Sequence, residues 1–399
     1  GTPIFVSSGY RDNNVFWYIV ATLEGQWWAI NDAGITEVTP PGGPIPGYAS
    51  NLPITDVWNG TVLFINDSLN APMYLLPGAS QFQYYDQYQT TLNTTGASGD
   101  GTTATLTFTA QLAAPYTVGS TIIVSGVAPD AYNGSYIVTA CTTSSVSYDS
   151  TATGSQTTVG TITNSYVWNY NTNWQNVTAG FLKLYSTPNV GSILVAGNLT
   201  ATLLDDTTVN YPVTVQWSQA FGLNEAPLTW QPTITNVANQ LEVPLRGPAL
   251  DAFPSNGQFF LCSYWDTVVF SPINYSTTSA PILGVRLYNQ GRGMLSSNCW
   301  ANTDDKVYGI DARDIWVFDG QSFQGLGNQR VKNWFYDQLD PQYYDRVFMQ
   351  VNTQKNQIEI YYPDKDAVNG VPNKMLAYRY ELDVWNAPRE VSRATMACE

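Results

Sequence analysis

Histidine is absent from this sequence of 399 residues. Because imidazole is the side chain that titrates near neutral pH, its absence excludes Ser-His-Asp and Cys-His catalysis and His-ligated zinc. Cysteine is scarce: Cys141, Cys262, Cys299 and Cys398 lie far apart, with no C-x-x-C pair. This spacing argues against zinc ribbons and thioredoxin-like sites, and a large core needs no disulfide framework. Cys141 and Cys262 lie in apolar strand-like runs, where we expect buried free thiols.

Positive charge and long apolar runs are also scarce. The chain has 16 Lys and Arg against 31 Asp and Glu, a formal net charge of −15 at pH 7. An acidic chain repels nucleic acid at long range, so a high-affinity DNA clamp is not expected, whereas the same charge suits a surface past which DNA slides. No stretch approaches the roughly 18 consecutive apolar residues of a membrane span, and we expect no membrane span.

Tyr, Trp, Thr and Val are abundant instead, which favours strands over helices. One pattern recurs: strand, short turn, strand, then a polar loop with Gly or Pro. Val15–Thr22 and Trp27–Asn31 flank one such turn, and "GQFFLCSYWDTVVFSPIN" from Gly257 repeats the pattern. Hairpins at a spacing of roughly 40–50 residues, each with an aromatic anchor, are typical of a β-propeller. We therefore predict an all-β propeller of roughly six or seven blades; a large sandwich or a string of small β-domains is the alternative.

One segment departs from this pattern. Between Asn93 and Ser165 tryptophan disappears and Thr, Ser, Ala and Val dominate. The segment opens with a flexible Gly-Ser-Asp run. We expect a β-sandwich-like module over residues 96–165, inserted by surface connections into a propeller formed by residues 1–95 and 166–399; a long disordered loop is the alternative. Its own strands are expected at Ala104–Thr109, Thr121–Ser125, Ser135–Ala140 and Ser145–Tyr148.

One short helix is expected in the C-terminal third, from Asn328 to Pro341. Val331, Phe335 and Leu339 recur at i, i+4 and i+8 on one face, Asn328 can cap the start, and Asp340-Pro341 ends the helix. We expect the helix to pack beside the propeller or against a neighbouring subunit.

Five aspartates crowd one short window: Asp304, Asp305, Asp311, Asp314 and Asp319. A calcium loop of the EF-hand type needs converging oxygens and a Glu at its twelfth position, and the window has no such Glu. In the expected hairpin Asp311 and Asp314 flank a turn, while Asp319 lies about 16 Å from Asp314 along the second strand. We interpret these aspartates as turn residues, and we expect no metal site, no cofactor and no catalytic residues.

Three further patterns bear on activity. A glycosidase propeller needs two carboxylates roughly 5–10 Å apart, which a sequence cannot place across blades, but the S-x-D-x-G-x-T-W box of sialidase propellers is absent. "NQGRGML" (Asn289–Leu295) lacks the spacing of a phosphate loop, so we expect a mobile turn. Tyr84-Tyr85 and Tyr343-Tyr344 could stack on sugars, although core or interface packing is the simpler interpretation.

Several motifs follow one another in the C-terminal half: "PVTVQWSQAFGLNEAPLTWQP", "QFFLCSYWDTVVF", "GRGMLSSNCWANTDDKVYGIDARDIWVFDGQSFQGLG", "RVKNWFYDQLD" and "MLAYRYELDVWNAP". In this order they resemble the β-propeller virion proteins of tailed bacteriophages, which serve as tail nozzle, tail tubular and head-stabilisation proteins. The insert resembles a small β-module of phage structural proteins. The signature residues of the resemblance are Trp217, Ser218, Trp230, Gly293, Tyr308, Trp316, Phe318, Asp319, Gly320, Phe335, Tyr378 and Trp385.

The resemblance implies a structural component of a virion tail rather than an enzyme. Such a protein would form a homo-oligomeric ring, preferably hexameric, that continues the DNA-ejection channel and contacts adaptor and fibre proteins. Double-stranded DNA would pass through the lumen without specific binding, and the tail would be assembled in the host cytoplasm. The alternative, suggested by the aromatic richness of the chain, is a carbohydrate-binding or glycan-cleaving β-propeller in host-surface recognition.

Overall fold

The computed structural model describes residues 1–11, 15–40, 43–49, 52–85, 87–88, 91–111, 114–116, 118–119, 121–164, 167–168, 174, 176–187, 191–203, 207–233, 236–273, 283–327, 329–392 and 394. The chain divides into two compact units. The propeller unit comprises Gly1–Tyr85 and Asn171–Glu399, and the inserted unit comprises Asp86–Tyr170.

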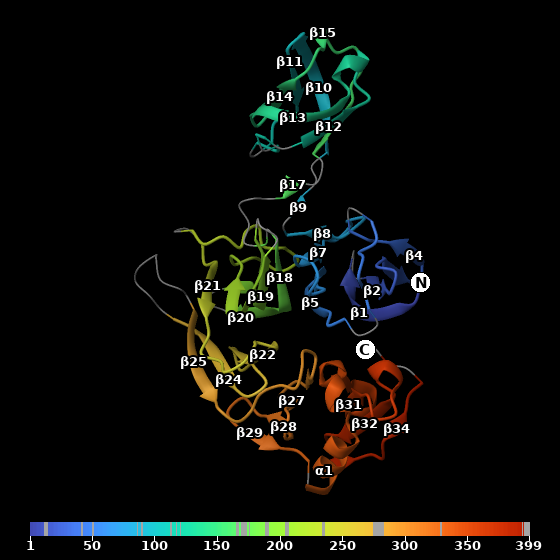
Figure 1. The fold of residues 1–399 in the computed structure, drawn as a ribbon, viewed down its shortest axis with the longest axis vertical. Coiled ribbons are helices and arrows are strands. Elements are labelled where there is room, and N and C mark those ends of the chain that lie inside the picture. Colours follow the sequence, from blue (N-terminus) through green and yellow to red (C-terminus); the bar gives the residue numbers. More distant parts are fainter. Residues whose placement is uncertain are drawn as a thin grey trace. The chain divides into compact units, whose positions relative to one another are not determined.

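The described part of the propeller unit forms six antiparallel sheets, which lie as blades around a ring (Figure 1). In every blade the first four strands pair in chain order. The first strands of neighbouring blades contact one another, as β5 does β18 and β26 does β30, so the first strands lie at the centre. Blades 1 to 3 consist of β1 (Pro3–Arg11), β2 (Val15–Thr22), β3 (Trp27–Asn31) and β4 (Gly34–Glu37); β5 (Thr55–Asn59), β6 (Val62–Asn66), β7 (Met73–Leu75) and β8 (Gln83–Tyr84); and β18 (Val177–Thr187), β19 (Gly191–Thr202), β20 (Thr208–Trp217) and β21 (Asn239–Glu242).

Blades 4 to 6 follow without interruption by another unit. Blade 6 has a fifth strand, β34, which pairs with β32 beyond β33. These blades consist of β22 (Asp251–Ser255), β23 (Gln258–Cys262), β24 (Thr267–Pro272) and β25 (Leu283–Asn289); β26 (Trp300–Asn302), β27 (Val307–Ile310), β28 (Ile315–Phe318) and β29 (Phe323–Gly325); and β30 (Phe348–Asn352), β31 (Gln357–Tyr362), β32 (Lys374–Arg379), β33 (Val384–Trp385) and β34 (Arg389–Glu390), with the 3-10 turns η2 (Pro341–Arg346), η3 (Thr353–Lys355) and η4 (Val368–Gly370).

The prediction of an all-β propeller with one short helix is confirmed, and the blades number six in the described chain. Local sequence explains much of this result. The strands expected at Val15–Thr22 and Trp27–Asn31 have those bounds. The turn between them is closed by Gly25 at φ 85°, a conformation that glycine adopts without strain.

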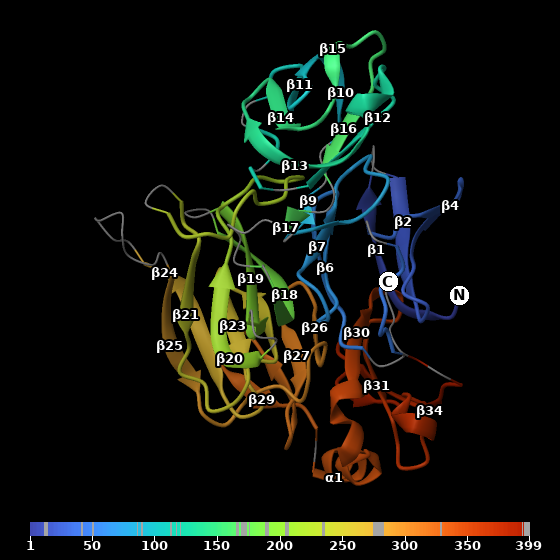
Figure 2. The ribbon, with the colours of Figure 1, turned by 45° about the horizontal axis from the view of Figure 1, so that its top comes forward.

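Helix α1 (Gln329–Gln338) packs against blade 6 (Figures 1 and 2). Phe335 and Leu339 are fully buried, and the Phe335 ring lies 5.0 Å from the ring of Tyr362 on β31. The helix predicted between Asn328 and Pro341 is therefore confirmed, and Phe335 and Leu339 of its predicted apolar face are buried. Asn328, the expected cap, lies outside the described residues.

Hydrophobic clusters join neighbouring blades in the propeller unit. One cluster joins blades 1 and 2, a second joins blades 2 and 3, a third joins blades 3 and 4, and a fourth spans blades 4, 5 and 6. Among the described residues no such cluster joins blade 6 to blade 1, and the strands of blade 1 pair only with one another. One apolar face of blade 1 is consequently left without an apolar partner in this part of the chain.

The inserted unit, for which we expected a β-sandwich-like module, consists of strands that close into a barrel. Its strands pair in the order β11-β14-β13-β12-β16-β10, and β10 pairs again with β11. Register shifts near Thr94 in β10 and Val138 in β13 let each of these strands pass between the two halves of the barrel. The elements are β10 (Thr91–Asp100), β11 (Thr103–Phe108), β12 (Thr121–Ser125), η1 (Asp130–Tyr132), β13 (Gly134–Cys141), β14 (Ser145–Asp149), β15 (Thr153–Ser155) and β16 (Thr161–Asn164), with the short ribbon β9 (Gln87–Tyr88) and β17 (Val167–Trp168).

The inserted unit begins earlier than the expected boundary at residue 96. The Gly-Ser-Asp run that we expected to be flexible lies in β10, which pairs with β11, β15 and β16. Pairing on both edges makes this run a central strand despite its weak local β-propensity. The four strands expected from the sequence all exist, and Thr121–Ser125 has the predicted bounds.

The thiols differ in their surroundings. Cys262 and Cys299 are buried and free, and burial raises the pKa of each to about 12. They are therefore protonated at neutral pH and are poor nucleophiles. Cys141, which we expected to be buried, is partly exposed at the end of β13. Cys398 lies outside the described residues.

Candidate functional site

Two of the five clustered aspartates, Asp311 and Asp314, lie at one turn and hold a cationic side chain. Asp311 Oδ1 accepts hydrogen bonds from the backbone N–H groups of Arg313 and Asp314 at 2.7 and 2.8 Å. Asp311 Oδ2 and Asp314 Oδ2 accept from the guanidinium of Arg292 at 3.1 and 2.9 Å. Burial raises the pKa of the Asp311 carboxyl, and the Arg292 charge acts in the opposite direction. Asp311 is thus both a turn residue and half of an ion pair.

The loop that carries Arg292 is bound on both sides, although the sequence suggested a mobile turn. Thr267 Oγ1 donates to the Arg292 carbonyl at 2.9 Å, and the Met294 N–H donates to the Ser263 carbonyl at 2.9 Å. A Cβ atom at Gly293 would lie 2.3 Å from that same carbonyl oxygen. Only glycine fits such a close approach of two backbones.

The same device recurs in other blades. In blade 2, Asp67 accepts from two backbone N–H groups of its turn and from the Tyr48 hydroxyl at 3.0 Å. In blade 4, Ser263 closes the turn and Asp266 accepts from Arg246 Nε at 2.8 Å. We call this arrangement a blade latch: the turn between the second and third strands of a blade is tied to a side chain from the segment preceding that blade. The latch of blade 5 gives Asp311 and Asp314 a structural role.

A polar group of side chains lies where the first strands of the blades converge, and we call it the axial cluster. Lys183 Nζ on β18 lies 3.5 Å from Asp251 Oδ1 on β22 and 5.3 Å from the ring centroid of Trp300 on β26. Trp300 Nε1 donates to Asp251 Oδ2 at 2.8 Å. Ser7 on β1 donates its hydroxyl to Asp56 on β5. Burial raises the pKa of the Asp56 carboxyl, and Lys183 opposes that shift.

Asn298 ties the axial cluster to further blades. Its side-chain amide donates to the Ile54 carbonyl at 3.0 Å, its backbone N–H donates to Asp251 at 3.1 Å, and its carbonyl accepts from the Met349 N–H at 2.8 Å. Asn298 holds φ at 63°, a left-handed conformation that Asn tolerates better than most residues. This network fastens the blades together.

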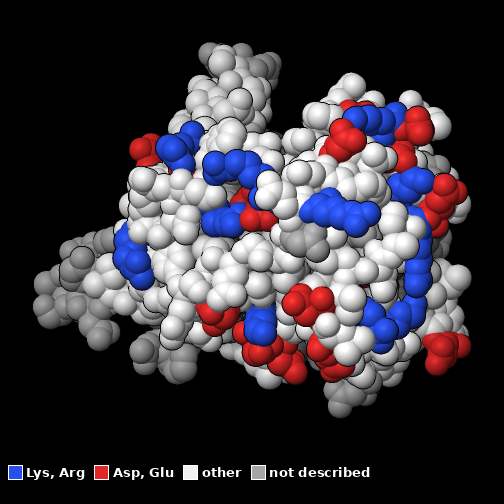
Figure 3. All heavy atoms as spheres, turned by 90° about the horizontal axis from the view of Figure 1, so that it is seen from below, with Lys and Arg blue, Asp and Glu red and all other residues white. Residues whose placement is uncertain are grey.

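Among the described residues no group of three or more His, Cys, Asp or Glu side chains is placed to hold a metal ion. No helix in the described chain is long and apolar enough to cross a membrane. On the face drawn in Figure 3, basic and acidic side chains are interspersed among uncharged ones, so this face presents no field of one sign.

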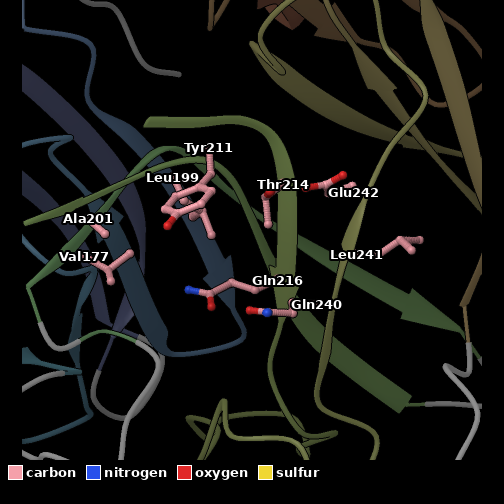
Figure 4. Close-up of a pocket in the computed structure, with 9 residues that line it drawn as sticks. All are labelled: Val177, Leu199, Ala201, Tyr211, Thr214, Gln216, Gln240, Leu241 and Glu242. Atoms are coloured by element: carbon pink, nitrogen blue, oxygen red, sulfur yellow. The ribbon is translucent and has the colours of Figure 1, made fainter. Parts of the chain in front are cut away.

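A pocket of about 440 Å³ is lined by residues from all four strands of blade 3 (Figure 4). This volume is within the range of about 300–1,000 Å³ that is usual for small-molecule sites. Gln216 is buried at its floor, and the amide nitrogen of Gln216 has no hydrogen-bond partner. The lining residues are Val177, Leu199, Ala201, Tyr211, Thr214, Gln216, Gln240, Leu241 and Glu242.

Like the Gln216 amide, the apolar face of blade 1 has no partner among the described residues. Tyr10, Phe16, Tyr18 and Ile35 are 56, 38, 44 and 66% exposed. The rings of Tyr10, Phe16 and Tyr18 form a ladder with edge-on contacts at centroid distances of 5.4 and 5.3 Å. We call these four residues the blade-1 face.

The residues that carry the phage resemblance do not converge on one site. They lie in blades 3 to 6 and in the connections around them, and most are packing residues. Trp230 is buried with its ring centroid 5.0 Å from that of Trp174, and Trp316 Nε1 donates to the Gly293 carbonyl at 3.2 Å. Fully or nearly fully buried are Trp217, Ser218, Trp230, Tyr308, Trp316, Phe318, Phe335 and Tyr378.

The other signature residues lie at the edges. Trp385 packs on Tyr378, with ring centroids 5.0 Å apart. Asp319 accepts from the N–H groups of Gln321 and Ser322 in an exposed turn, and these bonds lower the pKa of its carboxyl. Gly320 in that turn has φ 89°.

Two functional features were not expected from the sequence. Lys183 did offer a signal, because a lone charge stands between Leu182 and Leu184 in an apolar strand. Gln216 and the pocket gave no signal in the sequence, because the lining residues come from four strands. Of the tyrosine pairs, Tyr85 is a packing residue, with its ring 4.9 Å from that of Tyr74 and 5.7 Å from that of Trp230.

No family model matches this chain, and no curated protein matches it. Among solved structures, the computationally designed Ika8 protein is similar with a TM-score of 0.41 and 8% identity, over 98% of this chain and 88% of that one. The β-propeller domain of Cps50 (Swd1) from Myceliophteria thermophila has a TM-score of 0.36 and 8% identity, over 92% of this chain and 94% of that one. Both scores lie below 0.5, so the description of the fold rests on the strand pairing of this chain.

Proposed function

We propose that this chain is a structural component of a bacteriophage tail, a nozzle or tubular protein. It would form a homo-oligomeric ring, with six copies preferred, around the path of the ejected DNA, and it would anchor adaptor and fibre proteins. The ordered motifs between Val213 and Trp385 motivate the proposal. The net charge of −15 also suits a conduit, because it disfavours adhesion of DNA to the wall.

The structural observation that supports assembly is the blade-1 face. Soluble monomers rarely expose contiguous apolar patches, and such patches mark interaction surfaces. Aromatic residues are also enriched at the cores of protein interfaces. Tyr10, Phe16, Tyr18 and Ile35 form such a patch on one side of blade 1. A second copy of the chain is the partner that we propose for this face.

The proposal is tested by measuring the mass of the purified chain with light scattering and its shape with electron microscopy. We expect the wild type to form a ring, and the double variant Phe16→Ser/Tyr18→Ser to shift toward the monomer because it loses apolar area at the contact. Val159→Ser is the control, since Val159 is an apolar residue of the inserted unit that is even more exposed (64%) than Phe16 and Tyr18. A wild type that stays monomeric at high concentration and is absent from virions would refute the proposal.

Glycan binding is a second candidate, and the pocket on blade 3 favours it. Glycan cleavage is less well supported, because a pair of carboxylates is needed and Glu242 is the one acidic residue among those that line the pocket.

A further inference from the structure

The pocket on blade 3 is formed by an irregularity in the pairing of β19 with β20. Gly197 pairs with Val215, but Leu199 pairs with Tyr211, so β20 holds two extra residues in this interval. The interval contains Pro212, which cannot donate to the ladder and is tolerated at bulges. Bulges redirect side chains and are common beside binding sites. Tyr211 and Gln216, which flank the bulge, both line the same cavity.

The floor of the pocket carries an unsatisfied hydrogen-bond donor. The Gln216 side chain is 1% exposed, and its Nε2 has no partner. Burial of a polar group without a partner destabilises the folded protein, so such a group is expected to meet an acceptor in the working protein. Figure 4 shows the Gln216 amide beside that of Gln240, with the Tyr211 ring on the other side of the pocket. An occupant of the pocket can supply the missing acceptor.

The lining residues narrow the chemistry of that occupant. Lys and Arg are absent from the lining, which has one carboxylate, Glu242, in a chain of net charge −15. Anionic ligands such as phosphates are therefore disfavoured. Two amides, the Thr214 hydroxyl and Glu242 offer both donors and acceptors, and a ligand hydroxyl can bond with either kind. The partly exposed Tyr211 ring offers an apolar surface to C–H groups.

We infer that this pocket binds a neutral sugar ring, with Gln216 donating to a ring oxygen or hydroxyl and Tyr211 packing against a face of the sugar. The inference rests on the glycan-binding candidate for this pocket and specifies its ligand. It does not depend on the assembly function, because the pocket lies within blade 3 and shares no residue with the blade-1 face. If both proposals hold, each subunit of a tail ring would carry its own glycan site.

The test is saturation-transfer NMR and calorimetry on the full chain. The probes are the methyl glycosides of glucose, galactose and N-acetylglucosamine, together with maltose and lactose; glucuronate and adenosine are the comparison ligands. We expect at least one neutral sugar to bind and the comparison ligands not to bind. Gln216→Leu and Tyr211→Ala should each weaken binding about tenfold or more, because a site built to bond a ligand hydroxyl loses much affinity when one partner is missing.

Gln350→Leu is the matched control, since the side-chain oxygen of Gln350 on β30 is also buried without a partner but lies far from the pocket in sequence, in blade 6. This variant should bind as the wild type does. Gln216→Leu removes an unpaired buried amide, so it should fold with an unchanged or higher Tm. Failure of every neutral sugar to bind would overturn the inference. So would wild-type affinity in both Gln216→Leu and Tyr211→Ala, or preferred binding of adenosine or glucuronate. Light scattering of the same variants reports on assembly separately.

Discussion

Lys183 and its neighbours show how single residues determine the centre of the propeller. A charged pair in the interior is stable only when its geometry compensates the loss of hydration, and removal of one partner leaves an uncompensated charge. Asp251 meets this condition, because Lys183, Trp300 and the Asn298 N–H all surround its carboxylate. Asp56 is less well compensated, and burial raises the pKa of its carboxyl.

The raised pKa of Asp56 predicts a pH-dependent stability. The folded protein holds the Asp56 proton more tightly than the unfolded chain does, so its favourable contribution is full below the ordinary pKa of 3.8 and is lost as the pH rises through the folded-state pKa. Asp56→Asn removes the ionisation and can still accept from Ser7. Its free energy of unfolding, relative to wild type, should increase between about pH 3 and pH 7.

Urea unfolding at several pH values measures this difference. Asp32→Asn is the control, because Asp32 lies in an exposed turn, and its difference from wild type should change less with pH. A difference for Asp56→Asn that stays constant over the whole range would contradict the prediction.

At the scale of single elements, the blade latches connect turn chemistry with the packing of one blade on the next. The Asp311 carboxylate accepts hydrogen bonds from two backbone N–H groups and from the guanidinium of Arg292. Asp319 satisfies two backbone N–H groups in the same way, but in an exposed turn. The two aspartates therefore separate the contribution of a latch from that of a turn.

Asp311→Ala should reduce the free energy of unfolding by about 1–3 kcal/mol, because it leaves buried donors unpaired. Asp311→Asn keeps a side-chain acceptor for the turn, so it should cost less than Asp311→Ala. Asp319→Ala should cost least, because water can replace the lost acceptor. Chemical denaturation of the three variants checks the order, and an Asp319→Ala loss as large as that of Asp311→Ala would argue against the latch.

At the scale of the whole molecule, the chain combines a ring of blades with a barrel that has its own core. The barrel closes through the pairing of β10 with β11, and its buried residues, among them Leu106, Ile122 and Tyr148, form a separate cluster. The ribbon of β9 and β17 holds its two ends together. Closure removes most exposed strand edges, which favours independent folding.

Residues 86–170 expressed alone should therefore fold cooperatively, and the propeller unit with a short Gly/Ser linker in their place should also remain folded. Circular dichroism and hydrogen exchange of the two proteins test this expectation. A fragment that lacks protected amides in β11 to β14, or a propeller that unfolds without the insert, would show that the two units depend on each other.

Much of the fold was predictable from local pattern. The alternation and turn residues around Val15–Thr22 and Trp27–Asn31 mark strands without reference to distant residues, and the face formed by Phe335 and Leu339 marks a helix. Strand β10 was missed because its Gly, Ser and Asp residues are poor strand formers, and its pairing partners up to Thr163 decide its conformation. The pocket could not be predicted for the same reason. In the sequence Gln216 is one polar residue of an amphipathic strand, and only the fold brings Leu199 and Gln240 beside it.

The sequence by itself determined the all-β class, the repeated hairpins, the short helix and the absence of histidine chemistry, because each depends on composition or on neighbours a few residues apart. Tertiary structure alone decided that the blades number six, that the insert closes into a barrel, and that Lys183 pairs with Asp251. It also left the blade-1 face and the Gln216 amide without partners. These outcomes depend on contacts between residues far apart in the chain, which no local pattern encodes.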